Sequence, residues 1–290
     1  MRLTSVAPDL GYLRIGIANV YLFGLPHAGD RRWVLVDAGL PGSAPRIARA
    51  AASRFGVGAR PHAIVLTHGH FDHVGGLERL ADRWNTPVYA HPLELPYLTG
   101  RRSYPPPDPD VGGLMAALSP LYPRGPVDLG GRVRPLPTDG SVPGMPGWRW
   151  IATPGHSEGH VSFFREADRA LIVGDAFVTT RAESALAVLT QRRGIHGPPA
   201  YSTPGWADAR RSVEVLARLE PEIAASGHGR PLRGEGMRED LHRLARDFGR
   251  LGLPKTGRYV GRARNLVPRM LAGAGALALV GMVIGRGLHR

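Results

Sequence analysis

Apolar runs of strand length alternate with breaker-rich segments over the first eighty residues. Residues 19–23 and 33–36 are two such runs, separated by a Gly-, Pro- and Asp-containing turn. Apolar residues then recur at helical spacing up to residue 55, after Ser43, which is a suitable N-cap. Residues 63–67 form a third apolar run, and a new helical pattern begins near Leu77. The pattern therefore predicts two strands, a helix, a buried strand and another helix.

The second half of the chain repeats this order. Apolar runs at 148–152, 161–164 and 170–173 predict strands, and 223–225 is a further short apolar stretch. Two helices are expected from apolar spacing, one from near Asp208 to Pro221 and one over 237–248. Strands followed by helices thus occur twice, which predicts an α/β (α+β) fold.

A proline-rich segment, residues 96–147, separates the two halves. Within it only 111–118 could form a helix. Long irregular segments inside compact domains are usually functional, and Tyr97, Tyr104 and Tyr122 indicate that this one packs on other parts of the protein. We interpret it as a lid-like insertion over a site; the alternative is a surface excursion without a role.

Composition restricts the class of protein. The 290 residues suit one large domain or two small ones, and 43% hydrophobic residues can form a substantial core. The absence of cysteine excludes disulfides and thiolate metal sites. Of the net charge of +13, only +5 belongs to residues 1–248, which argues against nucleic acid as a partner. Because the N-terminus lacks an apolar signal-peptide core, we expect a cytoplasmic protein.

The strongest chemical signal directly follows the buried strand at 63–67. His68, His70, Asp72 and His73 form the pattern H-x-H-x-D-H on what we expect to be a tight loop. Imidazole and carboxylate groups are ligands for zinc, and also for iron and manganese. A strand before the motif and a helix after it favour a metal site over a merely solvated loop.

Three further candidate ligands also follow predicted strands and lie next to or near glycine. They are His156, Asp175 and His228. Alone, each would more simply be a packed or solvated side chain. Together with the first motif they place five histidines and two aspartates at strand ends.

These motifs resemble those of the metallo-β-lactamase superfamily, and within it the glyoxalase II and lactonase branch, over about residues 10–250. The resemblance implies a four-layer αββα sandwich whose two mixed sheets arise from an internal duplication. It implies one metal on His68, His70 and His156, and a second on Asp72, His73 and His228. It places Asp175 between the two metals and Asp37 close to the motif loop.

The resemblance also implies the chemistry. Two divalent metal ions, for which we expect Zn²⁺ with iron or manganese as alternatives, would share a hydroxide that attacks the carbonyl of a small ester, lactone or thioester. Asp72 and Asp175 would be the catalytic carboxylates. Thr67, Ser157 and His160 would support the ligands. His160 is not needed as a ligand, because seven ligands already fill two sites.

Several alternatives remain open at this stage. A phosphodiesterase or nuclease could use the same two-metal centre. A non-catalytic metal scaffold is disfavoured because no ligand is missing. A carboxylate at Asp175 argues against a narrow zinc β-lactamase, and the lack of glyoxalase II's basic helical domain argues against a glutathione thioester. The substrate itself is not specified; our candidates for the pocket wall are His91, Trp148, His196, Tyr201 and Trp206.

The chain is thus predicted to contain a hydrolase domain at 1–250 and a basic, apolar tail at 251–290. Residues 271–285 carry no charge and would span about 22 Å as a helix, short of the roughly 30 Å hydrocarbon core. One interpretation is an anchor to the inner face of the membrane. The other is a soluble helix packed on the domain or on a second copy in a homodimer.

Overall fold

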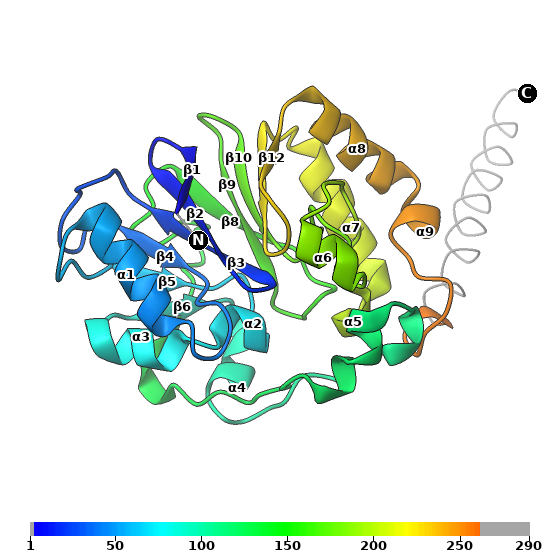
Figure 1. Cartoon of the computed structure of the whole chain (residues 1–290), viewed down its shortest axis with the longest axis horizontal. Helices are drawn as coiled ribbons and strands as arrows, with labels where there is room; N and C mark the ends of the chain where they lie inside the picture. The colour runs from blue at the N-terminus through cyan, green and yellow to red at the C-terminus, as the bar shows by residue number, and fades with distance from the viewer. Residues whose placement is uncertain (1–2, 262–290) are drawn as a thin grey trace, which may run out of the picture.

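The computed structural model describes residues 3–261. Two β-sheets pack face to face, and helices cover the outer face of each sheet (Figure 1). The predicted four-layer αββα arrangement with two mixed sheets is therefore confirmed.

The first sheet has seven strands in sequence order: β1 (Thr4–Ala7), β2 (Leu10–Ile15), β3 (Ala18–Phe23), β4 (Val34–Val36), β5 (Ala63–Val65), β6 (Val88–Ala90) and β7 (Val133–Pro135). Strands β1 to β4 pair antiparallel, whereas β4 to β7 pair parallel. The parallel strands β4 and β5 end at the same edge of the sheet, so the residues that follow them meet there.

The second sheet has five strands in the order β12-β11-β10-β9-β8: β8 (Trp148–Ala152), β9 (Val161–Arg165), β10 (Ala170–Gly174), β11 (Ile223–Ser226) and β12 (Leu232–Arg233). Only β10 and β11 pair parallel. Their ends again lie side by side, and each is followed by a candidate ligand.

The α-helices are α1 (Ala44–Phe55), α2 (Phe71–Val74), α3 (Leu77–Trp84), α4 (Leu95–Leu98), α5 (Leu114–Ala117), α6 (Ala185–Thr190), α7 (Trp206–Arg218), α8 (Glu235–Arg246) and α9 (Phe248–Leu251). Short 3₁₀ turns are η1 (Pro92–Glu94), η2 (Pro109–Val111), η3 (Ser119–Leu121), η4 (Gly130–Arg132) and η5 (Ala200–Ser202).

Three apolar layers hold the sandwich together. Alternate residues of each strand point to opposite faces. Where both faces are buried, as in β4, β5 and β10, the strand is continuously apolar. In β3, Leu22 faces the layer beneath α1 and α3, whereas Phe23 faces the second sheet. In β9, Phe163 faces the first sheet and Phe164 the layer beneath α7 and α8.

Some predicted details differ from the structure. Asp72 and His73 lie on the one-turn helix α2, not on a loop, because the His70 carbonyl accepts the N–H groups of His73 and Val74. Ser43 stands at the start of α1 but does not cap it; its hydroxyl donates to the Ala38 carbonyl instead. Strands β1, β2, β7 and β12 were not predicted, because they are short or interrupted by polar residues.

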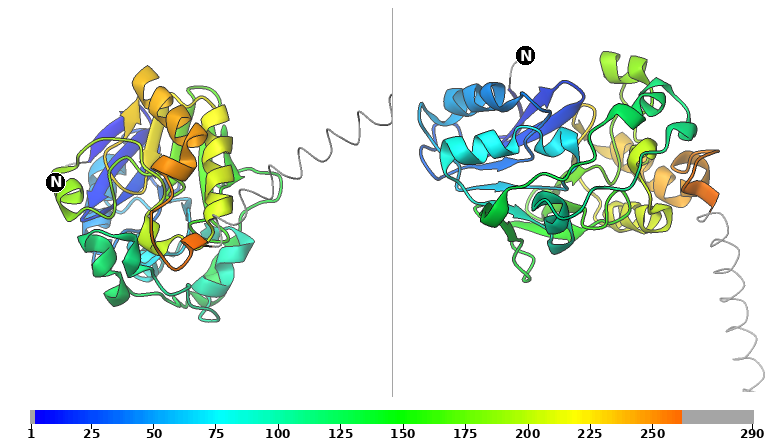
Figure 2. Two further views of the ribbon diagram at one scale, coloured as in Figure 1. Left: turned by 90° about the vertical axis from the view of Figure 1, so that its right-hand side faces the viewer. Right: turned by 90° about the horizontal axis from the view of Figure 1, so that it is seen from below.

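The insertion 96–147 crosses from the first half of the molecule to the second (Figures 1 and 2). Side chains tie it to the rest of the domain: the Tyr104 hydroxyl donates to Glu94, and Arg102 pairs with Glu158. Within the insertion, Tyr97 and Tyr104 stack with ring centroids 4.0 Å apart. Tyr259 reaches it from the C-terminal side, donating its hydroxyl to the Pro106 carbonyl at 2.7 Å. The insertion is thus a packed wall.

No helix within residues 3–261 is both long and apolar enough to cross a membrane. The predicted anchor or packed helix at 271–285 lies outside the described residues.

Replacing Phe163 by alanine should lower the free energy of unfolding by about 3–5 kcal/mol, because the ring is fully buried between the sheets and its loss leaves a cavity. Chemical denaturation would measure this. Leu189→Ala is the matched control, since Leu189 is 75% exposed and its loss should cost little. Equal midpoints for the two variants would contradict the assigned core.

Candidate metal centre

All seven predicted ligands meet at one edge of the sandwich. His68, His70, Asp72 and His73 follow β5, and the other three come from the second sheet. His156 follows β8, Asp175 follows β10 and His228 follows β11. Neighbouring strand ends of both sheets therefore bring residues 160 positions apart into one cluster.

The cluster divides into overlapping groups of three. Nitrogen and oxygen atoms close enough to share one ion are found in His68, His70 and His156, and in Asp72, His73 and His228. These are the two predicted triads. A third group joins His68, His73 and Asp175. The Asp175 carboxylate lies between the triads, with Oδ2 2.9 Å from His228 Nε2 and 3.4 Å from His156 Nε2.

Asp37 and Thr67 set the orientation of two histidines. Asp37 Oδ2 accepts the Thr67 hydroxyl at 2.9 Å and His73 Nδ1–H at 2.8 Å. Because that hydroxyl is already donating, it must accept from His68 Nδ1–H, 3.0 Å away. Both imidazoles are therefore protonated on Nδ1, which leaves the Nε2 lone pairs free to bind metal.

His156 and His228 are anchored in the same way. His156 Nδ1 lies 3.0 Å from Thr203 Oγ1, whose own hydrogen goes to the Pro199 carbonyl. His228 Nδ1 lies 2.9 Å from the Ile17 carbonyl, which can only accept. Each ring again presents Nε2 to the cluster.

His160 lies among the ligands but has no lone pair left for a metal. Its Nε2 accepts the Asp175 backbone N–H at 2.8 Å, and its Nδ1–H donates to Thr153 Oγ1 at 2.8 Å. It therefore fixes the backbone of Asp175, which agrees with the supporting role predicted for it.

The donor set fits metal ions. His68 Nε2, His73 Nε2 and Asp175 Oδ1 are buried and have no hydrogen-bond partner within the described residues. Leaving such atoms unpaired in the interior costs about 1–3 kcal/mol each. A cation held by them would remove this cost, and imidazole with carboxylate suits zinc, iron and manganese.

The pKa values divide the histidines into two sets. Burial and the neighbouring imidazoles lower the pKa of His68 well below its usual range, and burial lowers that of His70 to about 3. These rings are neutral, so each can offer a lone pair to a metal ion. Burial would also lower the pKa of His228, but the charge and hydrogen bond of Asp175, together with the charge of Asp72, outweigh it and raise the pKa to about 9. A cation on the second triad would thus take the place of a proton.

Gly227 makes room for the cluster. A Cβ at this position would lie 2.0 Å from Asp175 Oδ1 and 2.7 Å from His73 Cε1. Any side chain here would displace two of the ligands, so only glycine is compatible with this arrangement.

Glu94 is a site residue that the sequence analysis missed. It is fully buried, and it accepts hydrogen bonds from Gly69 N–H, Ser157 Oγ, Gly159 N–H and the Tyr104 hydroxyl. Gly69 separates His68 from His70, and Ser157 follows His156, so one carboxylate joins both loops of the first triad. A lone Glu inside the apolar stretch 93–98 was the available signal.

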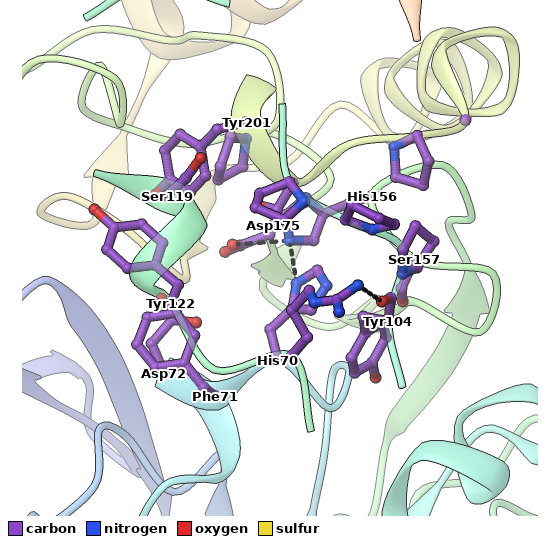
Figure 3. Close-up of a pocket in the computed structure, with 18 of the residues that line it drawn as sticks. His70, Phe71, Asp72, Tyr104, Ser119, Tyr122, His156, Ser157, Asp175 and Tyr201 are labelled. Atoms are coloured by element: carbon purple, nitrogen blue, oxygen red, sulfur yellow. Dashed lines mark hydrogen bonds and ion pairs between the residues drawn. The ribbon is translucent and has the colours of Figure 1, made fainter. Parts of the chain in front are cut away.

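A cavity of about 320 Å³ opens onto the cluster (Figure 3). Its walls come from the insertion, including Tyr104, Ser119 and Tyr122, and from the segment after β10, including Tyr201. Tyr201 was predicted here. The Tyr104 ring also packs on that of His70, with centroids 4.3 Å apart.

The other four predicted wall residues do not line this cavity. Trp148 faces the core between the sheets, and Trp206 faces the second sheet from the first turn of α7. His91 precedes η1 and packs against Trp150. His196 pairs through its backbone with Val178. Trp148 and Trp206 lie in the core because burying their large apolar rings between the layers is favourable.

Comparisons with known proteins agree with this geometry. A family model described as the Metallo-beta-lactamase superfamily matches residues 13–228. The chain is 48% identical to the probable metallo-hydrolase YflN of Bacillus subtilis (strain 168) over 254 residues, covering 84% of this chain and 96% of YflN.

Two further relatives are informative. A crystal structure of TTHA1623 in a di-iron-bound form superimposes with a TM-score of 0.51 at 27% identity, covering 81% of this chain and 96% of that one. A hydroxyacylglutathione hydrolase of Xylella fastidiosa (strain M12) is 47% identical, but over only 73 residues, 25% of each chain.

Replacing Asp37 by asparagine should weaken binding to the second triad by about 10–100-fold, because one of its donors, His73 Nδ1–H or Thr67, loses its acceptor. Competition with a chromophoric chelator would measure the affinity. The control is Asp139→Asn, an exposed carboxylate that bonds only Ser141. An affinity within twofold of the parent protein would contradict this role.

Replacing Glu94 by glutamine should lower the free energy of unfolding by about 1–3 kcal/mol or more. The two carboxylate oxygens accept four hydrogen bonds, whereas glutamine keeps one oxygen and replaces the other with an NH₂ group, which cannot accept. Thermal unfolding with and without metal would show the loss. Glu166→Gln, at an exposed ion pair with Arg149, is the control. Unchanged stability and unchanged first-triad affinity would show that Glu94 does not hold the loops.

Proposed function

Because the chain belongs to the metallo-beta-lactamase superfamily, we propose that it is a two-metal hydrolase that cleaves the acyl bond of a small ester, lactone or thioester. The observation that carries this proposal is the pair of triads that share the Asp175 carboxylate. Each triad offers three donor atoms, and within the described part of the chain three buried donor atoms of the cluster have no hydrogen-bond partner.

We assign one ion to each predicted triad. Bound there, two divalent cations would lower the pKa of a water molecule towards neutrality and stabilise negative charge on the carbonyl oxygen. The chain itself supplies position and proton transfer. Asp37, Thr203 and the Ile17 carbonyl fix the imidazole rings, so little reorganisation accompanies the reaction.

We assign to Asp72 the transfer of the proton from the attacking water to the leaving group. Its carboxylate lines the cavity, and Oδ2 lies 3.4 Å from His228 Nε2. From this position one of its oxygens can receive the proton released by water and return it to the leaving oxygen or sulfur. His160 Nε2 accepts the backbone N–H of Asp175, and this contact fixes the position of the Asp175 carboxylate between the two triads.

The cavity favours a small molecule as substrate. Its volume of about 320 Å³ is near the lower end for small-molecule sites. Tyrosine and proline side chains from the insertion form much of its wall, which suits a compact carbonyl compound better than a nucleic-acid strand. The short match to a hydroxyacylglutathione hydrolase supports including thioesters among the substrates to be tested.

We propose zinc as the resident metal, with iron as the main competitor. The second triad contains two histidines and a carboxylate, which both metals accept. The di-iron-bound form of TTHA1623 supports testing iron directly.

Protein expressed with added zinc or iron should contain about two metal ions per chain, and it should hydrolyse at least one ester, lactone or thioester. Chelation should abolish turnover, and readdition should restore it. Asp175→Ala should lower occupancy of both triads, whereas His228→Ala should mainly empty the second. Elemental analysis and a substrate panel measure these effects. Less than one metal per chain, or exclusive turnover of phosphodiesters, would contradict the proposal.

A further inference from the structure

The cavity wall contains charges that the metal centre does not use. Outside the seven ligands, the charged residues among those lining it are Arg124, Glu158 and Asp208. Glu158 forms two parallel bonds with Arg102, at 2.9 and 3.0 Å, and Asp208 pairs with Arg211. Since neither arginine partner lines the cavity, both carboxylates are neutralised from outside.

Arg124 has no such partner. Within residues 3–261 it forms no ion pair, and its one hydrogen bond is from Nη1 to the Tyr104 carbonyl at 3.3 Å. Tyr104 N–H donates in return to the Arg124 carbonyl at 3.0 Å. Tyr104 is itself fixed by Glu94 and packs on His70. The guanidinium of this exposed residue is therefore a positive charge in the cavity lining that no carboxylate within residues 3–261 compensates.

Ser119 adds a second unused group. Its side chain lines the cavity and is fully buried, and Oγ has no hydrogen-bond partner within the described residues. In Figure 3 it lies with Tyr122 and Tyr201 on the side of the cavity away from Tyr104. A buried hydroxyl without a partner is costly unless a ligand or water completes it.

We propose that the natural substrate carries a carboxylate at a distance from its reactive carbonyl, that Arg124 binds this carboxylate, and that the Ser119 hydroxyl bonds a second polar atom of the substrate. This inference rests on the proposed acyl-hydrolase function. A guanidinium matches a carboxylate through parallel N–H donors, which a neutral ester cannot exploit. The aromatic wall between the two groups accommodates the apolar body of the substrate.

Two esters of equal acyl length test this inference by turnover: mono-4-nitrophenyl glutarate, with a terminal carboxylate, and 4-nitrophenyl valerate, without one. Arg124→Met should raise KM for the glutarate ester by about tenfold or more and leave the valerate ester within about twofold. Ser119→Ala should leave KM for both of these esters within about twofold and raise KM for mono-4-nitrophenyl 3-hydroxyglutarate, whose hydroxyl supplies the second polar atom; an unchanged KM for that ester would overturn the Ser119 contact. Arg134→Met, which removes an exposed arginine outside the cavity, should change neither.

A binding measurement makes the result independent of turnover. The metal-loaded enzyme should bind 5-mercaptopentanoate about tenfold more tightly than 1-pentanethiol, and Arg124→Met should remove that difference. Binding preference without hydrolysis of any ester would support the carboxylate site and refute the proposed reaction. Hydrolysis of both esters with equal KM, and equal thiol affinities in parent and Arg124→Met, would overturn the carboxylate site while leaving the reaction intact.

Discussion

Among residues 3–261, three buried atoms of the candidate metal centre have lone pairs that no hydrogen bond satisfies: His68 Nε2, His73 Nε2 and Asp175 Oδ1. The contacts around them leave these lone pairs open. Nδ1–H of His68 donates to the Thr67 hydroxyl, and Nδ1–H of His73 donates to the Asp37 carboxylate. The remaining nitrogen is then buried with nothing to accept. Desolvating such groups opposes folding, so the apolar layers on both sides of each sheet must offset it. The strand ends, the hydrogen bonds to the Nδ1 atoms and the glycine at position 227 all serve this arrangement. Together they keep the donor atoms of each triad within 4.8 Å of one another.

The sequence predicted the layers, and it predicted which histidines and aspartates gather at the sheet edges, since both depend on local order. A run such as 63–67 must be buried, and the residues directly after it must lie at the sheet edge. The identity of the supporting contacts was not accessible in the same way. Glu94 reaches Gly69 and Gly159 across 25 and 65 positions of sequence, and no periodicity encodes such contacts. Trp148 shows the opposite error: it was predicted to line the substrate pocket, but its position in β8 turns its side chain into the core between the sheets.

The insertion contacts the candidate metal centre directly through Tyr104. Tyr104 belongs to the insertion, yet its hydroxyl bonds Glu94 and its ring covers His70. Changes in the insertion that preserve Tyr104 can therefore alter the cavity wall while the first triad keeps its geometry. Under the proposed function, this separation would let one metal centre serve different substrates, because the residues proposed to select the substrate are not those proposed to hold the metal.

The ligands are also divided between the two sheets, four from the first and three from the second. Each triad includes members of both, so an ion bound there cross-links the halves of the sandwich. Binding to the folded state alone adds stability that grows with the logarithm of free metal concentration. With ions bound at the proposed sites, opening of the two halves would first have to release them. The metal-loaded protein would then resist proteolysis longer than the metal-free protein, so that its amount as well as its proposed activity would depend on metal supply.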